Sequence, residues 1–94
     1  MRILIVGAGE VGSSIAANLA DTHEVVVVER DPAVVEELNF SLDVLAVQGD
    51  GTDLEVLQEA GVEQSDMVIA ATDSDETNIV ISGTAKTVTE TFTV

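Results

Sequence analysis

Four short apolar runs, rich in β-branched residues, are the feature that most constrains how this chain can fold. They lie at residues 3–6 (ILIV), 25–28 (VVVV), 44–47 (VLAV) and 67–71 (MVIAA). Near-continuous apolar runs of this length are typical of strands that are buried on both faces of a parallel sheet. The sequence therefore predicts an α/β fold in which helices cover both faces of the sheet.

Helical signals separate these runs. The first intervening stretch has apolar residues at intervals of four, namely Val11, Ile15 and Leu19. Asp31 and Pro32 predict a second helix with a capping residue and a proline at its first position, and Gly61 predicts the end of a third. The order is thus β-α-β-α-β-α-β-α, with residues 92–94 as a candidate fifth strand. Right-handed crossovers between such strands give an open parallel sheet.

The length of 94 residues is enough for one small domain with a modest core. The sequence contains no linker, internal repeat or low-complexity tract. The alternating pattern stops where a doubly wound domain would begin its second half. We therefore expect residues 1–94 to form one domain that is truncated at its C-terminus.

The charge of the chain is strongly acidic. It has 18 acidic and 3 basic residues, a formal net charge of -15 and a pI near 4.1. Such a surface disfavours nucleic-acid phosphates and anionic membranes as partners. It suits a halophilic protein, because the Debye length falls to about 3 Å at 1 M salt and self-repulsion is then screened. An acidic domain from an ordinary cytosol is the alternative.

No cysteine is present, so disulfides and thiolate metal sites are excluded. The continuous apolar run before Gly7 has only four residues, which is too short for the apolar region of a signal peptide. No stretch approaches the length of a membrane span. We expect an intracellular domain without direct membrane insertion.

The segment VGAGEVG follows the first apolar run directly and opens the first helix. Its glycines Gly7, Gly9 and Gly12 have the spacing G-x-G-x-x-G. In a Rossmann-like sheet the first glycine allows the tight turn, the second lets a pyrophosphate approach, and the third allows close packing of helix and strand. The N–H groups at the helix N-terminus then attract phosphates. The motif predicts a dinucleotide- or nucleotide-binding loop.

An acidic residue, Glu29, ends the second apolar run at about the spacing of 20 residues that such sites require. Its carboxylate can accept hydrogen bonds from both ribose hydroxyls and would repel a 2′-phosphate. NAD-type or adenosine ligands are therefore favoured over NADP. The neighbouring Arg30 is either a phosphate contact or a solvated side chain.

The acidic segment DSDETN, at 73–78, begins like a Ca²⁺-binding loop. The chain lacks the Gly and Glu that such a loop needs at its sixth and twelfth positions. A helix start explains the acids: Asp73 or Ser74 can cap the helix, and Asp75 and Glu76 favour its first turn through the helix dipole. We predict no metal site here, and a transient Mg²⁺ or Ca²⁺ contact beside a bound nucleotide is the alternative.

No group of residues has the arrangement of a catalytic centre. The only histidine, His23, precedes the second apolar run, at the amino end of the sheet. Ser13 and Ser14 fit the first turns of a helix and have no neighbouring base. Asp50 fits a loop carboxylate, and Asp53, or the Thr before it, fits the cap of the third helix. We predict no catalytic residue and no enzymatic activity.

Taken together, these stretches resemble the N-terminal nucleotide-binding domain of Trk-type potassium uptake regulators, the RCK or TrkA-N family. The matching segments are VGAGEVG at 6–12, VVVVERDP at 25–32, VQGDGTD at 47–53, LQEAG at 57–61 and MVIAATDSDETN at 67–78. They span nearly the whole chain. The combination of the last three segments is much more specific than the glycine motif alone.

The resemblance implies roles for the residues of the first loop and the second strand. The loop from Gly7 to Gly12 would hold the pyrophosphate, with backbone N–H groups of Glu10 and Val11 contributing. Glu29 would bind the ribose, although an Asp is more usual there.

The resemblance also implies roles for the loops after the third and fourth strands. Asp50 and Gly51 would lie along the adenine edge, while Thr72 and Asp73 would approach the ribose and phosphates. The last helix, expected to include residues 81–90 (ISGTAKTVTE), departs from the family in its many Thr residues and in Gly83. A mid-helix glycine costs about 1 kcal/mol relative to Ala, so this helix is either frayed or packed closely at Gly83.

In function, the resemblance implies a non-catalytic sensor of NAD or NADH, alternatively of ATP or ADP. It would control a membrane potassium transporter subunit from the cytoplasmic side and would form homo-oligomers. The alternative is the cofactor-binding half of an NAD-dependent oxidoreductase, similar to saccharopine dehydrogenase. That class shares the glycine motif and the acidic strand end but does not account for ATDSDETN.

Overall fold

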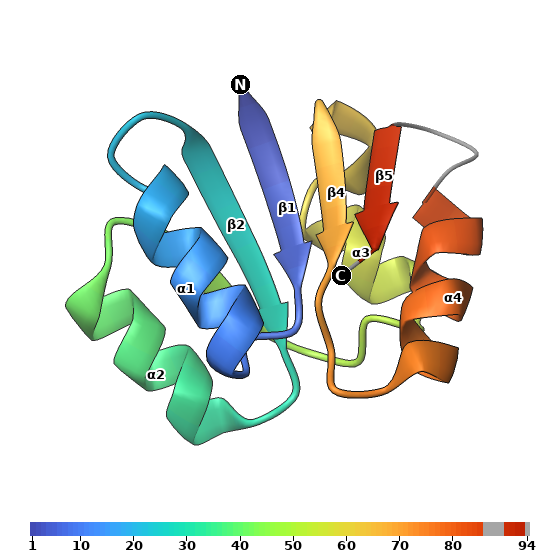
Figure 1. The fold of residues 1–94 in the computed structure, drawn as a ribbon, viewed down its shortest axis with the longest axis horizontal. Helices are drawn as coiled ribbons and strands as arrows, with labels where there is room; N and C mark the ends of the chain where they lie inside the picture. The colour runs from blue at the N-terminus through green and yellow to red at the C-terminus, as the bar shows by residue number, and fades with distance from the viewer. Residues whose placement is uncertain (86–89, 94) are drawn as a thin grey trace.

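The computed structural model describes residues 1–85 and the backbone of residues 90–93. The strands are β1 (Arg2–Val6), β2 (Glu24–Glu29), β3 (Leu45–Gln48), β4 (Met67–Ala70) and β5 (Glu90–Thr93). The helices are α1 (Glu10–Leu19), α2 (Pro32–Ser41), α3 (Leu54–Glu59), the short 3₁₀ helix η1 (Val62–Gln64) and α4 (Asp75–Ala85). All pairings between the strands are parallel, in the order β3-β2-β1-β4-β5 (Figure 1).

The predicted α/β architecture is confirmed, with one error near the C-terminus. β5 begins at Glu90, so the expected fifth strand is present and the expected helix over 81–90 is wrong at its last residue. α4 ends at Ala85, and the rest of that expected helix, residues 86–89, lies outside the described residues. Thr-rich segments favour strand as readily as helix, because β-branched side chains are stiff at χ1.

The two faces of the sheet carry two clusters of buried apolar side chains. Ile3 and Ile5 of β1 pack with residues of α1 and α2, whereas Leu4 and Val6 pack with residues of α3, η1 and α4. Figure 1 shows α1 and α2 over one face and α3 behind the other. Alternate residues of a strand point to opposite faces, so a strand covered on both sides must be apolar throughout. This is why the strands read as unbroken apolar runs.

The direction in which successive strands are added to the sheet changes at β1. The chain passes outward from β1 through β2 to β3, and α3 then returns it across the sheet to β4, on the other side of β1. The carboxyl ends of β1 and β4 therefore diverge into separate connections at neighbouring positions, at the lower edge of the sheet in Figure 1. Open α/β sheets bind ligands at such a switch point.

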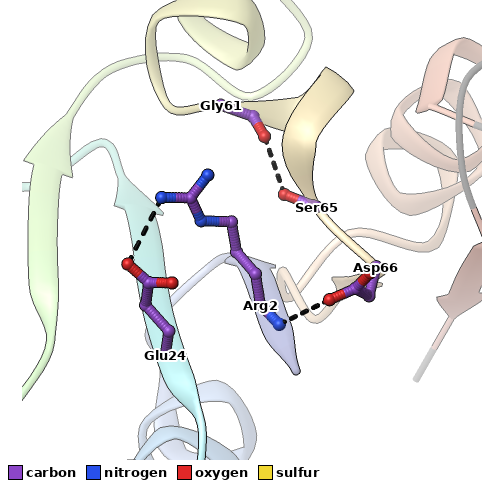
Figure 2. A network of polar contacts seen from close by, with 5 residues as sticks. All are labelled: Arg2, Glu24, Gly61, Ser65 and Asp66. Carbon is purple, nitrogen blue, oxygen red and sulfur yellow. Dashed lines mark hydrogen bonds and ion pairs between the residues drawn. The ribbon is translucent and has the colours of Figure 1, made fainter.

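At the opposite, amino end of the sheet, a polar network joins the three central strands (Figure 2). The backbone N–H of Arg2 donates to Oδ2 of Asp66 at 2.8 Å, and its guanidinium lies 3.3 Å from Oε1 of Glu24. Close by, the hydroxyl of Ser65 donates to the carbonyl of Gly61 at 2.8 Å. Because the ion pair is exposed, it contributes at most about 1 kcal/mol. The network connects the starts of β1 and β2 with the residue before β4.

The outer edge of β3 is occupied by a side chain of α2. The amide of Asn39 donates to the carbonyl of Ala46 at 3.0 Å and accepts from its N–H at 2.9 Å. It therefore takes the place of a further strand at that residue. Occupied edges of this kind hinder pairing with other chains.

Two glycines in helices provide a test of this packing. An added Cβ at Gly12 would collide with the carbonyl oxygen of Gly7, whereas one added at Gly83 would have no described atom within 4 Å beyond its chain neighbours and the backbone of its own helix. We expect Gly12→Ala to lower the free energy of unfolding by about 1–3 kcal/mol through overpacking. Gly83→Ala, its matched control, is expected to raise it by about 1 kcal/mol. Urea denaturation of both variants measures this, and a neutral Gly12→Ala would contradict the packing.

Candidate functional site

A cavity of about 300 Å³ opens at the carboxyl ends of β1, β2, β3 and β4. Eight residues that the sequence analysis selected contribute to its lining: Gly7, Gly9, Glu29, Arg30, Asp50, Gly51, Thr72 and Asp73. The remaining three, Glu10, Val11 and Gly12, form the first turn of α1 behind this lining. The fold thus brings segments from four separate loops to one place.

The glycine-rich loop turns sharply against the end of β4. Gly7 has a φ of 102°, and a Cβ there would lie 2.7 Å from the backbone nitrogen of Thr72. Gly9 differs, since apart from its chain neighbours no described atom lies within 4 Å of its Cβ position, and its φ of -70° is open to any residue. The space in front of Gly9 is therefore free for a ligand.

The start of α1 presents backbone N–H groups to this space. Gly9 is the N-cap and has no side chain to accept a hydrogen bond, and the first bond of the helix runs from the N–H of Ser13 to the carbonyl of Gly9 at 2.9 Å. The N–H groups of Glu10, Val11 and Gly12 precede that bond, so they have no acceptor within the helix. Such a terminus attracts anions, phosphates above all.

The other three α-helices begin differently. The carboxylates of Asp31 and Asp53 accept from backbone N–H groups at the starts of α2 and α3, at 2.9 and 3.0 Å. The hydroxyl of Ser74 accepts from the N–H of Thr77 at 3.2 Å at the start of α4. Of the two caps considered for each of the last two helices, the structure selects Asp53 and Ser74.

Glu29 joins two loops beside the cavity. Its Oε1 accepts from the N–H of Ala8 at 2.9 Å and its Oε2 from the N–H of Asp31 at 2.7 Å. Each carboxylate oxygen can accept more than one hydrogen bond, so capacity for ribose hydroxyls remains. The sequence analysis missed this bridging role. The only signal for it was the choice of Glu, whose longer side chain can reach the glycine-rich loop.

Asp50 lies at the exposed rim of the cavity. Its Oδ1 accepts from both the N–H and the hydroxyl of Thr52, at 2.9 and 2.7 Å. These two bonds, helped by the charge of Arg30, hold the pKa of the Asp50 carboxyl below its ordinary value of 3.8. Its neighbour Gly51 is packed against Val6, where an added Cβ would collide with the valine side chain. The loop after β3 therefore presents a fixed carboxylate.

The loop after β4 is held from behind by a buried residue that the sequence analysis did not select. Asn78 is fully buried, and its Oδ1 accepts from the N–H and the hydroxyl of Thr72 at 2.9 and 2.6 Å. Its Nδ2 donates to the Thr72 carbonyl at 3.1 Å. The helical spacing of Asn78, Ile81 and Ala85 was a signal for its burial, because it places all three on the same buried face of α4.

Other site types find no support within the described ranges. His23 lies between α1 and β2, at the amino end of the sheet, as the sequence predicts. Among described residues, no group of three or more acidic or histidine side chains is arranged to hold a metal ion. No helix within this part of the chain is long and apolar enough to cross a membrane.

The strand order and the glycine-rich loop define a Rossmann-like α/β domain. The TrkA-N domain family model matches residues 3–94, and the chain belongs to this family. Its relatives include a Trk system potassium uptake protein TrkA homolog of Archaeoglobus fulgidus, 43% identical over 88 residues, and TrkA of Halomonas elongata, 40% identical over 94 residues. These matches cover 94% and 99% of the chain but only 20% and 21% of the relatives, so the chain spans about a fifth of their length.

Solved structures with the same fold include the TrkA-N domain of the inner membrane protein ybaL from Escherichia coli. It is 27% identical, with a TM-score of 0.82, and the match covers 98% of this chain and 70% of that one. The Kef C-terminal domain of Shewanella denitrificans, solved in its AMP-bound form, has a TM-score of 0.81 at 14% identity over 99% of this chain and 58% of that one. At that identity the likeness shows the fold alone.

The pKa of Asp50 tests the geometry of the rim. Because the pKa is lowered in the folded state, Asp50 stabilises the fold above pH 3.8, and this contribution is lost as the pH falls through the folded pKa. We expect Thr52→Val to raise the pKa part of the way to 3.8, since the backbone bond remains. NMR titration of the carboxyl carbon measures it. Thr52→Ser keeps the hydroxyl and should keep the low pKa; equal values in both variants would contradict the assignment.

Proposed function

We propose that this chain is a regulatory nucleotide-binding domain that binds NAD(H) or an adenine nucleotide and thereby controls a Trk-type potassium transporter. It converts occupancy of the cavity into a change of conformation, without turnover of the ligand. Membership of the TrkA-N family and relatives named as Trk potassium uptake proteins support this function.

One observation carries the proposal: the uncapped start of α1 faces open space at Gly9, while the Glu29 carboxylate lies beside the same cavity. A nucleotide needs both features, because its phosphates seek N–H donors and its ribose seeks a hydrogen-bond acceptor. In our proposal the N–H groups of Glu10, Val11 and Gly12 hold the phosphates. Glu29 holds the ribose.

The adenosine part of the ligand is common to both candidate classes. We propose that Asp50 and Gly51 flank the adenine and that Thr72 and Asp73 form the wall beside the ribose and phosphates. One solved structure with this fold, the Kef C-terminal domain described above, contains AMP. Another, from Archaeoglobus fulgidus, is described as an NAD(P)-binding domain. It has a TM-score of 0.80 at 22% identity, and the match covers 97% of this chain and 68% of that one. The Glu29 carboxylate disfavours a 2′-phosphate and thus NADP.

The partner that we propose is a membrane potassium transporter subunit, which this domain would contact from the cytoplasmic side as a homo-oligomer. The names of the relatives, Trk system potassium uptake proteins, support a potassium transporter as the partner. The net charge of -15 disfavours nucleic acid as a partner. The oxidoreductase alternative gains no such support, since the relatives described above are named for potassium uptake.

Gly9 offers a way to remove binding without disturbing the fold. Apart from its chain neighbours, no described atom lies within 4 Å of a Cβ added there, so we expect Gly9→Val to keep its thermal stability. Its affinity for the nucleotide should fall at least about tenfold, or 1.4 kcal/mol, because the side chain fills the approach of the phosphates. Calorimetry with NAD⁺, NADH, AMP, ADP and ATP, using the wild-type chain and this variant, measures both the ligand class and the effect.

The control is Gly83→Ala, on α4 and outside the cavity lining, which should bind like the wild type. If the wild-type chain binds none of the five nucleotides, the proposed function is wrong for this chain. Turnover of NADH with a substrate would instead favour the oxidoreductase.

Salt should strengthen binding. The charge of -15 repels an anionic ligand at long range, and the Debye length falls from about 10 Å at 0.1 M to about 3 Å at 1 M. We therefore expect affinity to rise over this range of KCl, as a halophilic adaptation would require. A calorimetric series with matched ionic strength from NaCl separates screening from a specific effect of K⁺. Monotonic weakening from low to high KCl would contradict this prediction.

A further inference from the structure

We propose that Asn78 is a positioning residue of the nucleotide site: it fixes the wall formed by Thr72–Ser74 at the switch point between β1 and β4. The inference rests on the proposed function for its ligand. It concerns a residue that does not line the cavity and that the glycine motif does not include.

The side chain of Asn78 makes three hydrogen bonds to Thr72. Oδ1 of Asn78 accepts from the N–H and the hydroxyl of Thr72, and Nδ2 donates to the Thr72 carbonyl. The amide thus engages both backbone polar groups and the hydroxyl proton of one residue. Of the buried residues that the structure describes, only Asn78 and Ser65 are polar. Burying an amide is costly unless it is hydrogen-bonded, so this arrangement strongly favours one position of Thr72.

Thr72 belongs to the wall of the cavity and lies against the glycine-rich loop. Thr72, Asp73 and Ser74 line it, and the Thr72 nitrogen lies 2.7 Å from where a Cβ on Gly7 would be. Any outward or inward shift of Thr72 therefore changes the space beside the glycine-rich loop. The Thr72 hydroxyl also accepts from the N–H of Ser74 at 3.2 Å, which extends the constraint along the wall.

Asn78 is itself held in place by α4. Its N–H donates to the carbonyl of Ser74 at 3.0 Å, within the first turn of α4. On the same helix face, Ile81 and Ala85 are buried in the core between the sheet and α3. The wall is thus tied through one side chain to the rigid core. Since Asn78 does not line the cavity, it acts on the ligand through the wall and not by direct contact.

The chain contains a matched control for this contact. The amide of Asn39 holds the N–H and carbonyl of Ala46 with the same bidentate chemistry, but at the outer edge of β3 and outside the cavity lining. An Asn→Asp change keeps the shape of either side chain and replaces the donating Nδ2 with an oxygen, which faces a backbone carbonyl. Asn39 is exposed and Asn78 is buried, so the stability of both variants is measured alongside binding.

The experiment compares Asn78→Asp with Asn39→Asp in calorimetric binding of the nucleotide that the wild-type chain binds best, below the melting temperature of every variant. We expect about tenfold weaker binding for Asn78→Asp, from the loss of one buried hydrogen bond, and wild-type affinity for Asn39→Asp. Unchanged affinity in folded Asn78→Asp, or an equal loss in Asn39→Asp, overturns the inference.

A second pair of variants decides the matter if Asn78→Asp does not fold. Thr72→Val removes the hydroxyl bond at 2.6 Å and keeps the size of the side chain, whereas Thr72→Ser restores the hydroxyl. We expect about fivefold weaker binding for Thr72→Val and recovery with Thr72→Ser. Equal affinities for the two variants overturn the inference.

A ligand-free measurement separates this inference from the proposed function. The backbone amide NMR signals of Gly7 and Gly9 report on the loop across the switch point from Thr72. We expect them to shift in Asn78→Asp, or in Thr72→Val against Thr72→Ser, and to stay in place in Asn39→Asp. If the wild-type chain binds no nucleotide, the proposed function fails, and unchanged Gly7 and Gly9 signals then overturn the positioning role.

Discussion

The close contact between the turn after β1 and the end of β4 is the constraint on which the rest of this structure depends. Only a glycine can stand at residue 7, because its φ is 102° and a side chain there would meet the backbone of Ala71 and Thr72. A second glycine, Gly12, is required where α1 passes over the carbonyl of Gly7. The turn sets the direction of α1, and α1 sets where its N–H groups point. The cavity exists because these two requirements are met beside the switch point.

Local signals in the sequence account for most of the fold. Buried strands covered on both faces must be apolar throughout, so the runs at 3–6 and 25–28 are visible without a structure. Asp31 followed by Pro32 starts α2 as predicted, because both the cap and the fixed φ of proline act within one turn. The expected helix failed at Glu90, in a Thr-rich segment where local preference is weak and pairing with β4 decides.

The candidate site was predictable in its location and not in its contacts. Parallel strands place their carboxyl ends at one edge, so Glu29, Asp50 and Thr72 had to gather once the strand order was known. The bond from Ala8 to Glu29 spans 21 residues and depends on the length of one side chain. Asn78 lies in an acidic segment whose composition is typical of an exposed surface. Its burial follows only from which face of α4 packs against the core. Side-chain contacts of this kind arise from packing, which periodicity does not describe.

The charge of the chain imposes a further condition on how an anion could be held. Of its three basic residues, Arg2 is paired with Glu24 at the opposite end of the sheet and Lys86 lies outside the described residues. Arg30 is therefore the one described cation in the cavity lining. The phosphates of the proposed ligand would depend mainly on backbone N–H groups, which are dipoles that act at short range. Salt screens the long-range repulsion between the net charge of -15 and an anionic ligand, and it leaves those short contacts largely intact. A site built from backbone suits an acidic protein in concentrated salt better than one built from lysine and arginine, because ion pairs weaken under the same screening.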